Sequence, residues 1–403
     1  MNSKNSFFII YKTGEYTKLR LSLGGNSMQI YLDNSATTKP YKEVVQAMFN
    51  CMIQCYGNPS SIHSLGEQAK KYLKECRKSI AHSINAAEEE IIFTSGGSES
   101  NNFILKGFLK AGDHMITTCV EHSSILNCCL ELGKDGVEIT YLNVDSSGKI
   151  RLEELKNNIK ENTKLISIIH INNEIGTIQD IEAIGKLIKE VKPDTLFHID
   201  AVQSYGKYSI DVNKYNIDSL SISAHKIHGP KGIGAAFIRK IYIPKALISG
   251  GGQEYGLRSG TENLPAIVGF AEAAKIMINN LQKNYEWICK LRYYLIYKLG
   301  VAEGIKVNSN VENSLPHIVN ISVPGIRSGK ILFYLNERGI YVSKSSACSA
   351  RNLKDSHVLK AIGLPQEDIM GSLRISFCEE NTFEEIDALV KFITTCISEL
   401  KAS

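Results

Sequence analysis

One stretch of the 403-residue chain, Leu220-Ser221-Ile222-Ser223-Ala224-His225-Lys226, is followed directly by Ile227-His228-Gly229-Pro230-Lys231-Gly232. The first residues form a short apolar run typical of a buried strand, and the Gly/Pro loop ends it. A lysine at the end of such a strand can hold an aldehyde as a Schiff base. Taken alone, Lys226 is better explained as a surface lysine in a turn. The neighbouring segments decide between the two interpretations.

The preceding apolar strand, Leu196-Phe197-His198-Ile199-Asp200, also ends in a functional group. Asp200 is suited to pairing with a protonated pyridine nitrogen, and Gln203 is close enough in sequence to reach a ring hydroxyl. The alternative for Asp200 is a helix N-cap, which is common at such a junction.

Two glycine-rich segments are candidates for anion binding. Ser95-Gly96-Gly97-Ser98-Glu99 stands at an expected helix start, where backbone N–H groups can bind a phosphate. The stretch from Gly250 to Thr261 is too long for a simple turn, and its alternative is a flexible surface loop.

Short β-branched runs alternate with amphipathic segments from about residue 63 onward. This pattern predicts an α/β fold with a mainly parallel sheet covered on both faces, of the seven-stranded type. In such sheets ligands bind beyond the carboxyl ends of the strands. Strands are expected at Ile91–Thr94, Met115–Cys119, Leu165–Ile169, Leu196–Ile199, Leu220–Ile222 and Ala235–Ile238. Helices are expected at 98–111, 123–133, 151–159 and 181–191.

After about residue 284 the pattern predicts a smaller α+β domain. Its strands are expected at His317–Val323, Ile340–Ser343 and Ser372–Phe377, before a terminal amphipathic helix. We therefore expect a large domain at 46–284 and a small domain built from 28–45 and 285–403. Residues 1–27 are expected outside the fold, and one hypothesis is that translation starts at Met28.

Composition places the chain among ordinary globular proteins. Apolar residues make up 43% and charged residues 22%, and the net charge is only +4, most of it within residues 1–27. This predicts no nucleic-acid-binding surface, and no apolar run is long enough to predict a membrane span. None of the 10 cysteines forms a Cys-x-x-Cys pair, which favours small core residues in a reducing, cytoplasmic compartment.

The ordered set of motifs resembles the cysteine desulfurases of the NifS/IscS type, from Met28 almost to the end of the chain. These enzymes belong to the class-V aminotransferase family of fold type I pyridoxal-phosphate enzymes, which are homodimers. The motifs are Tyr31–Thr38, Gly57–Ser61, Thr94–Ser100, Glu121-His122, Asn172–Gly176, His198–Ser204, His225-Lys226, Arg258–Thr261 and Ser346-Ala347-Cys348.

The resemblance implies a role for each matching residue. Lys226 carries pyridoxal 5′-phosphate and moves the Cα proton of the substrate, Asp200 pairs with the ring nitrogen, Gln203 pairs with the ring hydroxyl, and His122 stacks on the ring. The phosphate is held by Gly97, Ser98, Ser223 and His225, with Thr261 of the partner subunit. Asn173 borders both the cofactor and the substrate, and Arg374 binds the substrate carboxylate, for which a guanidinium is a bidentate match.

Cys348 is the nucleophile implied by the resemblance. Its thiolate attacks the sulfur of L-cysteine, leaving a Cys348 persulfide and L-alanine. Ser343–Asn352 is small and polar, as a mobile loop requires, and Lys344 and Arg351 favour the thiolate. No resident metal is implied, although Cys348 is in a position to contact a nascent iron–sulfur cluster during transfer.

Some features depart from the family pattern. Ser345 and Ala224 stand where many relatives have glycine, which bears on loop mobility and turnover rate. The length of the segment after Cys348 is typical of the long-loop group (group I).

The sulfur acceptor is expected to be an iron–sulfur scaffold or an enzyme of tRNA or cofactor thiolation. The chain ends soon after its terminal helix, whereas relatives that dock a scaffold often continue further, which weakens the case for a scaffold as the partner. The alternatives are a selenocysteine lyase, an aminotransferase of the same fold, and a catalytically silent binding partner.

Overall fold

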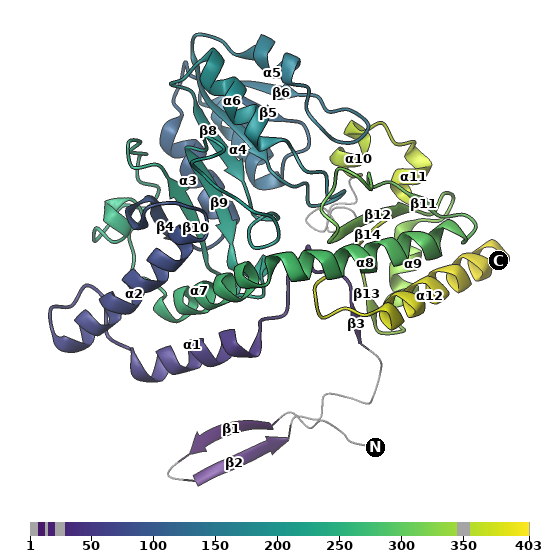
Figure 1. The fold of residues 1–403 in the computed structure, drawn as a ribbon, viewed down its shortest axis with the longest axis horizontal. Coiled ribbons are helices and arrows are strands. Elements are labelled where there is room, and N and C mark those ends of the chain that lie inside the picture. Colours follow the sequence, from purple (N-terminus) through teal and green to yellow (C-terminus); the bar gives the residue numbers. More distant parts are fainter. Residues whose placement is uncertain (1–6, 13–14, 21–28, 345–354, 403) are drawn as a thin grey trace.

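The computed structural model describes residues 7–12, 15–20, 29–344 and 355–402 (Figure 1). Cys348, the expected nucleophile, lies outside the described residues. The Lys226 segment forms a strand, β9 (Ser219–Ser223), followed by one 3₁₀ turn, η2 (Ala224–Lys226).

A seven-stranded sheet forms the centre of the larger part of the molecule, in the order β4-β10-β9-β8-β7-β5-β6. Only β10 runs antiparallel to its neighbours, so the predicted mainly parallel α/β fold is confirmed. Besides β9, its strands are β4 (Ile91–Thr94), β5 (His114–Thr118), β6 (Glu138–Leu142), β7 (Thr163–Ile169), β8 (Leu196–Asp200) and β10 (Gly234–Ile238).

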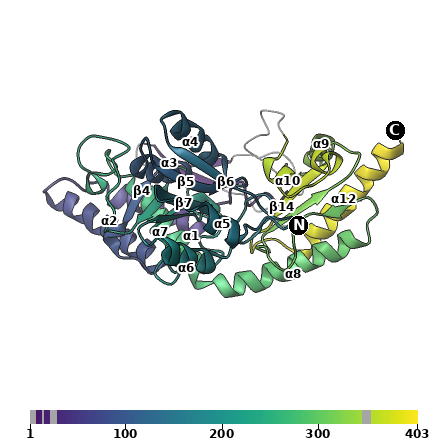
Figure 2. The ribbon, with the colours of Figure 1, turned by 90° about the horizontal axis from the view of Figure 1, so that it is seen from above.

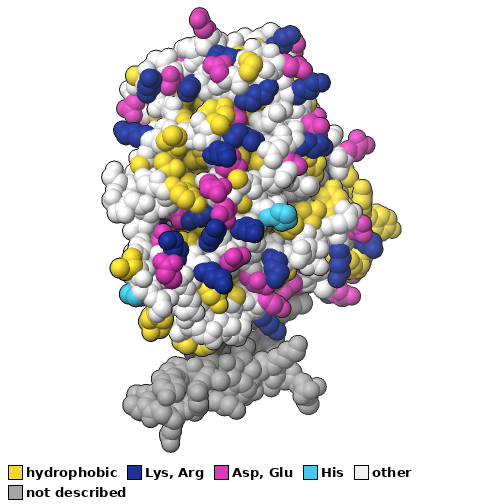
Figure 3. All heavy atoms as spheres, turned by 60° about the vertical axis from the view of Figure 1, so that its left-hand side comes forward, with side chains coloured by type: hydrophobic (Ala, Val, Ile, Leu, Met, Phe, Trp, Pro, Cys, Tyr) yellow, Lys and Arg dark blue, Asp and Glu magenta, His cyan; other side chains and the backbone are white. Residues whose placement is uncertain are grey.

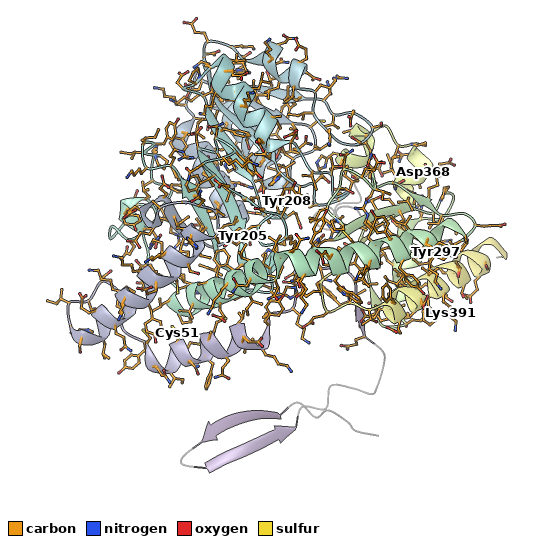
Figure 4. All side chains as sticks on the ribbon, viewed as in Figure 1. Cys51, Tyr205, Tyr208, Tyr297, Asp368 and Lys391 are labelled. Atoms are coloured by element: carbon orange, nitrogen blue, oxygen red, sulfur yellow. The ribbon has the colours of Figure 1, made fainter. Side chains whose placement is uncertain are left out.

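Helices cover both faces of this sheet because successive strand residues point to opposite sides. Phe197 belongs to the cluster under α2, α6 and α7, whereas its neighbour Leu196 packs under α3 and α4. On the first face, Tyr205, which is labelled in Figure 4, packs edge-on against Phe270 of α7, and their ring centroids are 6.0 Å apart. The helices of this part are α1 (Lys42–Gln54), α2 (Ser64–His82), α3 (Gly97–Phe108), α4 (Ser123–Lys134), α5 (Leu152–Asn158), α6 (Ile181–Val191) and α7 (Leu264–Asn279).

The smaller part has its own hydrophobic core, and the long helix α8 (Leu281–Gly300) runs along both parts (Figure 2). Ile30 and Leu32, from the start of the chain, are buried in this C-terminal core. Its strands are β3 (Ile30–Tyr31), β11 (Lys306–Val307), β12 (Ile318–Ser322), β13 (Ile340–Tyr341) and β14 (Ser372–Ser376). Its other helices are α9 (Ser328–Asn336), α10 (His357–Ala361), α11 (Gln366–Met370) and α12 (Phe383–Ala402). The expected domain limits remain a prediction.

Near the N-terminus, β1 (Phe7–Lys12) and β2 (Glu15–Arg20) pair with each other in a sheet of their own. Whether residues 1–27 belong to the fold remains a prediction. Within the described ranges, no helix has both the length and the hydrophobicity that a membrane crossing requires.

The sequence patterns locate most elements but miss several. The edge strand β6 was not predicted, because four of its five residues are at least partly exposed and no continuous apolar run marks it. The helices α7 and α8 were not predicted either. Helix α3 ends at Phe108, before the predicted 111, and Leu109 is already extended.

The glycine-rich stretch from Gly250 to Thr261 is held to the sheet by a buried ion pair. Arg77 of α2 and Glu254 contact each other through two N···O pairs of 2.6 and 2.7 Å, and both side chains are almost fully buried. Glu254 also accepts from the backbone N–H of Phe93 at 2.8 Å. These contacts hold Glu254 and Tyr255 at φ values of +49° and +59°, which are unfavourable for residues with side chains. The stretch is therefore anchored at its centre.

Glu254→Ala should lower the free energy of unfolding by about 3–5 kcal/mol, because it leaves the Arg77 charge buried and unpaired. Urea-induced unfolding measures this change. Glu182→Ala, which removes an exposed ion pair with Lys214, should have a much smaller effect. Equal effects of the two substitutions would contradict an anchoring role for Glu254.

Candidate active site

A cavity of about 280 Å³ lies where the carboxyl ends of the central strands meet the smaller part of the molecule. Such strand ends are where open α/β sheets bind ligands. Most of the predicted site residues share this cavity. Its lining includes Gly97, Ser98, His122, Asn173, Asp200, Gln203, Ser223, His225, Lys226 and Arg374.

Lys226 lines the cavity from the turn after β9 and is only partly exposed. Its Nζ donates to the backbone carbonyls of Ser35 and of Ala36, the latter at 2.9 Å. Lys226 is therefore a hydrogen-bonded residue of the cavity wall, and its role as the cofactor lysine remains a prediction. Beside it, burial and the Lys226 charge lower the pKa of His225 to about 3, so this imidazole is neutral near pH 7.

Asp200 ends β8 and is buried. Its Oδ2 accepts from Asn101 Nδ2 at 2.8 Å, and its Oδ1 accepts from the backbone N–H of Val202 at 3.0 Å. The second contact forms a turn within the chain after β8, where no helix begins, so the helix N-cap alternative is wrong. The carboxylate also faces the cavity.

Asn101, which the sequence analysis missed, connects Asp200 to His122. The Nδ2 of Asn101 also donates to Ser124 Oγ at 2.9 Å, and that hydroxyl lies 2.8 Å from His122 Nδ1. The Oδ1 of Asn101 lies 3.2 Å from His198 Nε2. A fully buried amide thus fixes the positions of two cavity side chains from different strand ends.

His122 is the N-cap residue of α4, and its Nδ1 accepts from the backbone N–H of Ser124. The ring hydrogen of the neutral form therefore lies on Nε2. Burial lowers the pKa of His122, although the Asp200 charge acts in the opposite direction. The neutral, oriented ring is available to stack on a planar ligand.

The start of α3 offers an anion site beside these groups. Gly96 has a φ of +151°, and a Cβ on Gly97 would lie 2.4 Å from Val202 Cγ2, so only glycine fits at Gly97. The backbone N–H groups of the first helical turn lack helical partners and attract anions. Ser98 and Ser223 line the same end of the cavity.

Arg374 reaches the cavity from β14 in the smaller part of the molecule. Its Nη2 donates to Asp33 Oδ1 at 2.8 Å, and its Nη1 donates to the carbonyl oxygen of Asn173 at 2.9 Å. Within the part of the chain that the structure describes, the buried Nε of Arg374 and the buried Oε1 of Gln203 have no hydrogen-bond partner. Both atoms belong to residues that line the cavity.

Two predicted residues are not seen at the cavity. Thr261 is exposed and does not line it, and Cys348 lies outside the described residues. Three acidic or basic residues that were not predicted as site residues do line it, namely Glu121, Glu174 and His357. Glu121 and Glu174 had a sequence signal, since they stand beside His122 and Asn173 in two of the motifs, whereas His357 gave none.

Comparisons with known proteins agree with this geometry. The family Aminotransferase class-V matches residues 30–389. A cysteine desulfurase IscS from Methanosarcina thermophila is 43% identical over 376 residues, which cover 92% of this chain and 93% of that protein. The chain belongs to the class-V aminotransferases and, within them, to the cysteine desulfurases.

Solved structures of relatives agree with the family assignment. A NifS-like protein matches with a TM-score of 0.87 and 39% identity, over 92% of this chain and all of that one (100%). SspA in complex with cysteine matches with a TM-score of 0.77 and 36% identity, over 88% of this chain and 100% of that one.

Glu121 should make stability depend on pH. Burial raises the pKa of Glu121 from 4.5 to about 8, so the folded protein retains a proton that the unfolded chain releases. The contribution of this group to the free energy of unfolding therefore falls as the pH rises between these two values. Glu121→Gln keeps a neutral group there, so its unfolding midpoint should fall less than that of the wild type from about pH 5 to about pH 8. Parallel pH profiles would contradict a protonated Glu121.

Proposed function

We propose that this cysteine desulfurase transfers the sulfur of L-cysteine to its own Cys348, with pyridoxal 5′-phosphate bound in the cavity. The observation that carries the proposal is the convergence of Lys226, Asp200 and His122 on one cavity from the ends of three strands. An amine, a carboxylate and a flat neutral ring are the groups that hold the aldehyde, the ring nitrogen and the ring face of this cofactor.

The described residues fit the cofactor in other respects. Gln203 Oε1 is buried without a partner and can accept from the ring hydroxyl. The start of α3 at Gly97 and Ser98, with Ser223 and His225, would hold the phosphate. Because His225 is neutral, it would serve there as a hydrogen-bonding group without a charge.

Arg374 and Asn173 would bind the substrate. The guanidinium already lies against the Asn173 carbonyl, and its Nε is buried without a partner among the described residues, so it retains a donor for a carboxylate. The match to SspA in complex with cysteine supports an amino acid as the ligand of this cavity.

Different residues of the chain would carry out the different steps of the reaction. When bound, pyridoxal phosphate supplies an electron sink for negative charge at the substrate Cα. Lys226 Nζ would move the Cα proton, and Asp200 would hold the ring nitrogen in its protonated form. The Cys348 thiolate would then attack the substrate sulfur, forming an S–S bond while the C–S bond breaks. The C–S electron pair stays on the substrate Cβ, which takes up a proton, and Lys226 would return the proton to Cα to give alanine, while Cys348 is left as a persulfide.

The two flanks of the Cys348 segment support this assignment. On one side, Ser343 pairs with Arg374 through backbone hydrogen bonds of 2.8 and 3.2 Å. On the other side, the Oγ of Ser356 donates to Glu174 Oε2, and the next residue, His357, lines the cavity. Both described flanks of the Cys348 segment are therefore hydrogen-bonded to residues that line the cavity.

A homodimer is the proposed form of the enzyme, with Thr261 of the partner subunit completing the phosphate site. Thr261 is exposed, and the stretch before it is anchored through Glu254. Hydrophobic side chains are also exposed on the side of the molecule that Figure 3 presents. On α1, Val45, Phe49, Met52 and Ile53 are each more than half exposed. Such an apolar helix face on a globular protein is typical of an interface.

The acceptor of the persulfide sulfur is proposed to be a protein of iron–sulfur assembly or of tRNA or cofactor thiolation, in the cytoplasm. All nine cysteines within the described residues are free thiols, which supports a reducing compartment. A transferable persulfide distinguishes this function from that of an aminotransferase.

Cys348→Ser should lower alanine formation from cysteine by at least about 1,000-fold, because a hydroxyl is poorly ionised near neutral pH. The same variant should keep the absorbance of the bound cofactor, whereas Lys226→Ala should lose covalent attachment of pyridoxal after borohydride reduction. Cys289→Ser, at a partly exposed thiol elsewhere, should retain wild-type activity. Alanine formation by Cys348→Ser at the wild-type rate would contradict the proposed nucleophile.

A further inference from the structure

A second cluster of potential ligands lies outside the cavity lining. His228 follows the Lys226 turn, and Cys378 and Glu379 follow β14 after one intervening residue. One ligand atom from each lies within 4.8 Å of the other two. The cluster therefore joins the turn that carries Lys226 to the strand that carries Arg374.

The hydrogen bonds of His228 orient its free nitrogen toward the cluster. Its Nδ1 lies 2.8 Å from the carbonyl oxygen of Lys39, which can only accept, so Nδ1 carries a hydrogen. In the neutral ring, Nε2 then presents a lone pair to Glu379 Oε1, 3.5 Å away. Stacking on Tyr41, with centroids 4.3 Å apart, fixes the ring plane. Two acceptors that face each other in a buried site require a cation between them.

The carboxylate of Glu379 is also incompletely satisfied. The Oε1 of Glu379 accepts from the Tyr41 hydroxyl, but its buried Oε2 has no hydrogen-bond partner among the described residues. Cys378 Sγ is buried beside these two groups and completes a set of nitrogen, sulfur and oxygen atoms that face one another.

We propose that His228 Nε2, Cys378 Sγ and a carboxylate oxygen of Glu379 bind a zinc ion, with water in the fourth position. Zinc combines nitrogen, sulfur and oxygen ligands, and the bond lengths of a tetrahedral site place neighbouring nitrogen and oxygen ligands about 3.4 Å apart. The 3.5 Å between His228 Nε2 and Glu379 Oε1 agrees with this spacing. The sequence analysis predicted no resident metal, because these residues lie far apart in the sequence.

Lys207 is the competing cation. It is buried nearby, and its charge acts on both Cys378 and Glu379. Burial lowers the pKa of Lys207 to about 8, so this amine can release its proton when a divalent ion binds. If the Lys207 ammonium serves as the permanent counter-charge instead, the cluster binds no metal.

Zinc binding to the full-length, cofactor-loaded protein distinguishes these possibilities. The protein is first treated with a chelator and then dialysed against buffered Zn²⁺. The amount of zinc bound per chain is then measured by elemental mass spectrometry. The wild type and Cys289→Ser should bind one more zinc ion than Cys378→Ser, in which affinity at this site should fall at least about tenfold. Cys348→Ser should retain this zinc, which excludes the proposed nucleophile as its ligand.

Glu379→Gln is the second test and keeps the side-chain volume. It should also lose the zinc, while circular dichroism and cofactor absorbance report whether each variant is folded. Equal zinc content in the wild type and in folded Cys378→Ser or Glu379→Gln would overturn the proposal. So would a wild type that binds no zinc, which would leave Lys207 or a proton as the cation.

Discussion

A single buried guanidinium joins the two parts of the chain at the catalytic cavity. Arg374 is 1% exposed, and removing such a charge from water is costly unless it is paired. Asp33, from the start of the described chain, supplies the opposite charge, and the Asn173 carbonyl accepts a second hydrogen bond. Three distant segments therefore meet at one side chain, and the position of β14 relative to the large sheet depends on it.

The cavity is built from groups whose protonation follows from burial. His122 and His225 are held neutral, and the raised pKa of Glu121 keeps this acid protonated near pH 7. Asn101 supplies hydrogen bonds to both sides of the site, since it donates to Asp200 and reaches His122 through Ser124. The carboxylate of Asp200 and the amine of Lys226 thus have these neutral groups beside them, in a buried setting where a nearby charge acts strongly.

Sequence patterns predicted the parts of this site that depend on local order. Lys226 and Asp200 stand directly at strand ends, so the alternation of strands and helices was enough to bring them to one edge of the sheet. Asn101 could not be predicted in this way, because its role arises from contacts with residues on two other strand ends. The same holds for His228 and Cys378, which meet only through the packing of β14 against the Lys226 turn. Thr261 and Cys348 remain predictions, since one depends on a second subunit and the other lies outside the described residues.

The central claim is that the sulfur of L-cysteine passes directly to Cys348. Intact-protein and peptide mass spectrometry after incubation with cysteine, without reductant, tests it most directly. The account predicts one added sulfur on the peptide that contains Cys348, removable by reductant. Added sulfur on another cysteine alone, or alanine formed with no added sulfur on the protein, would contradict it.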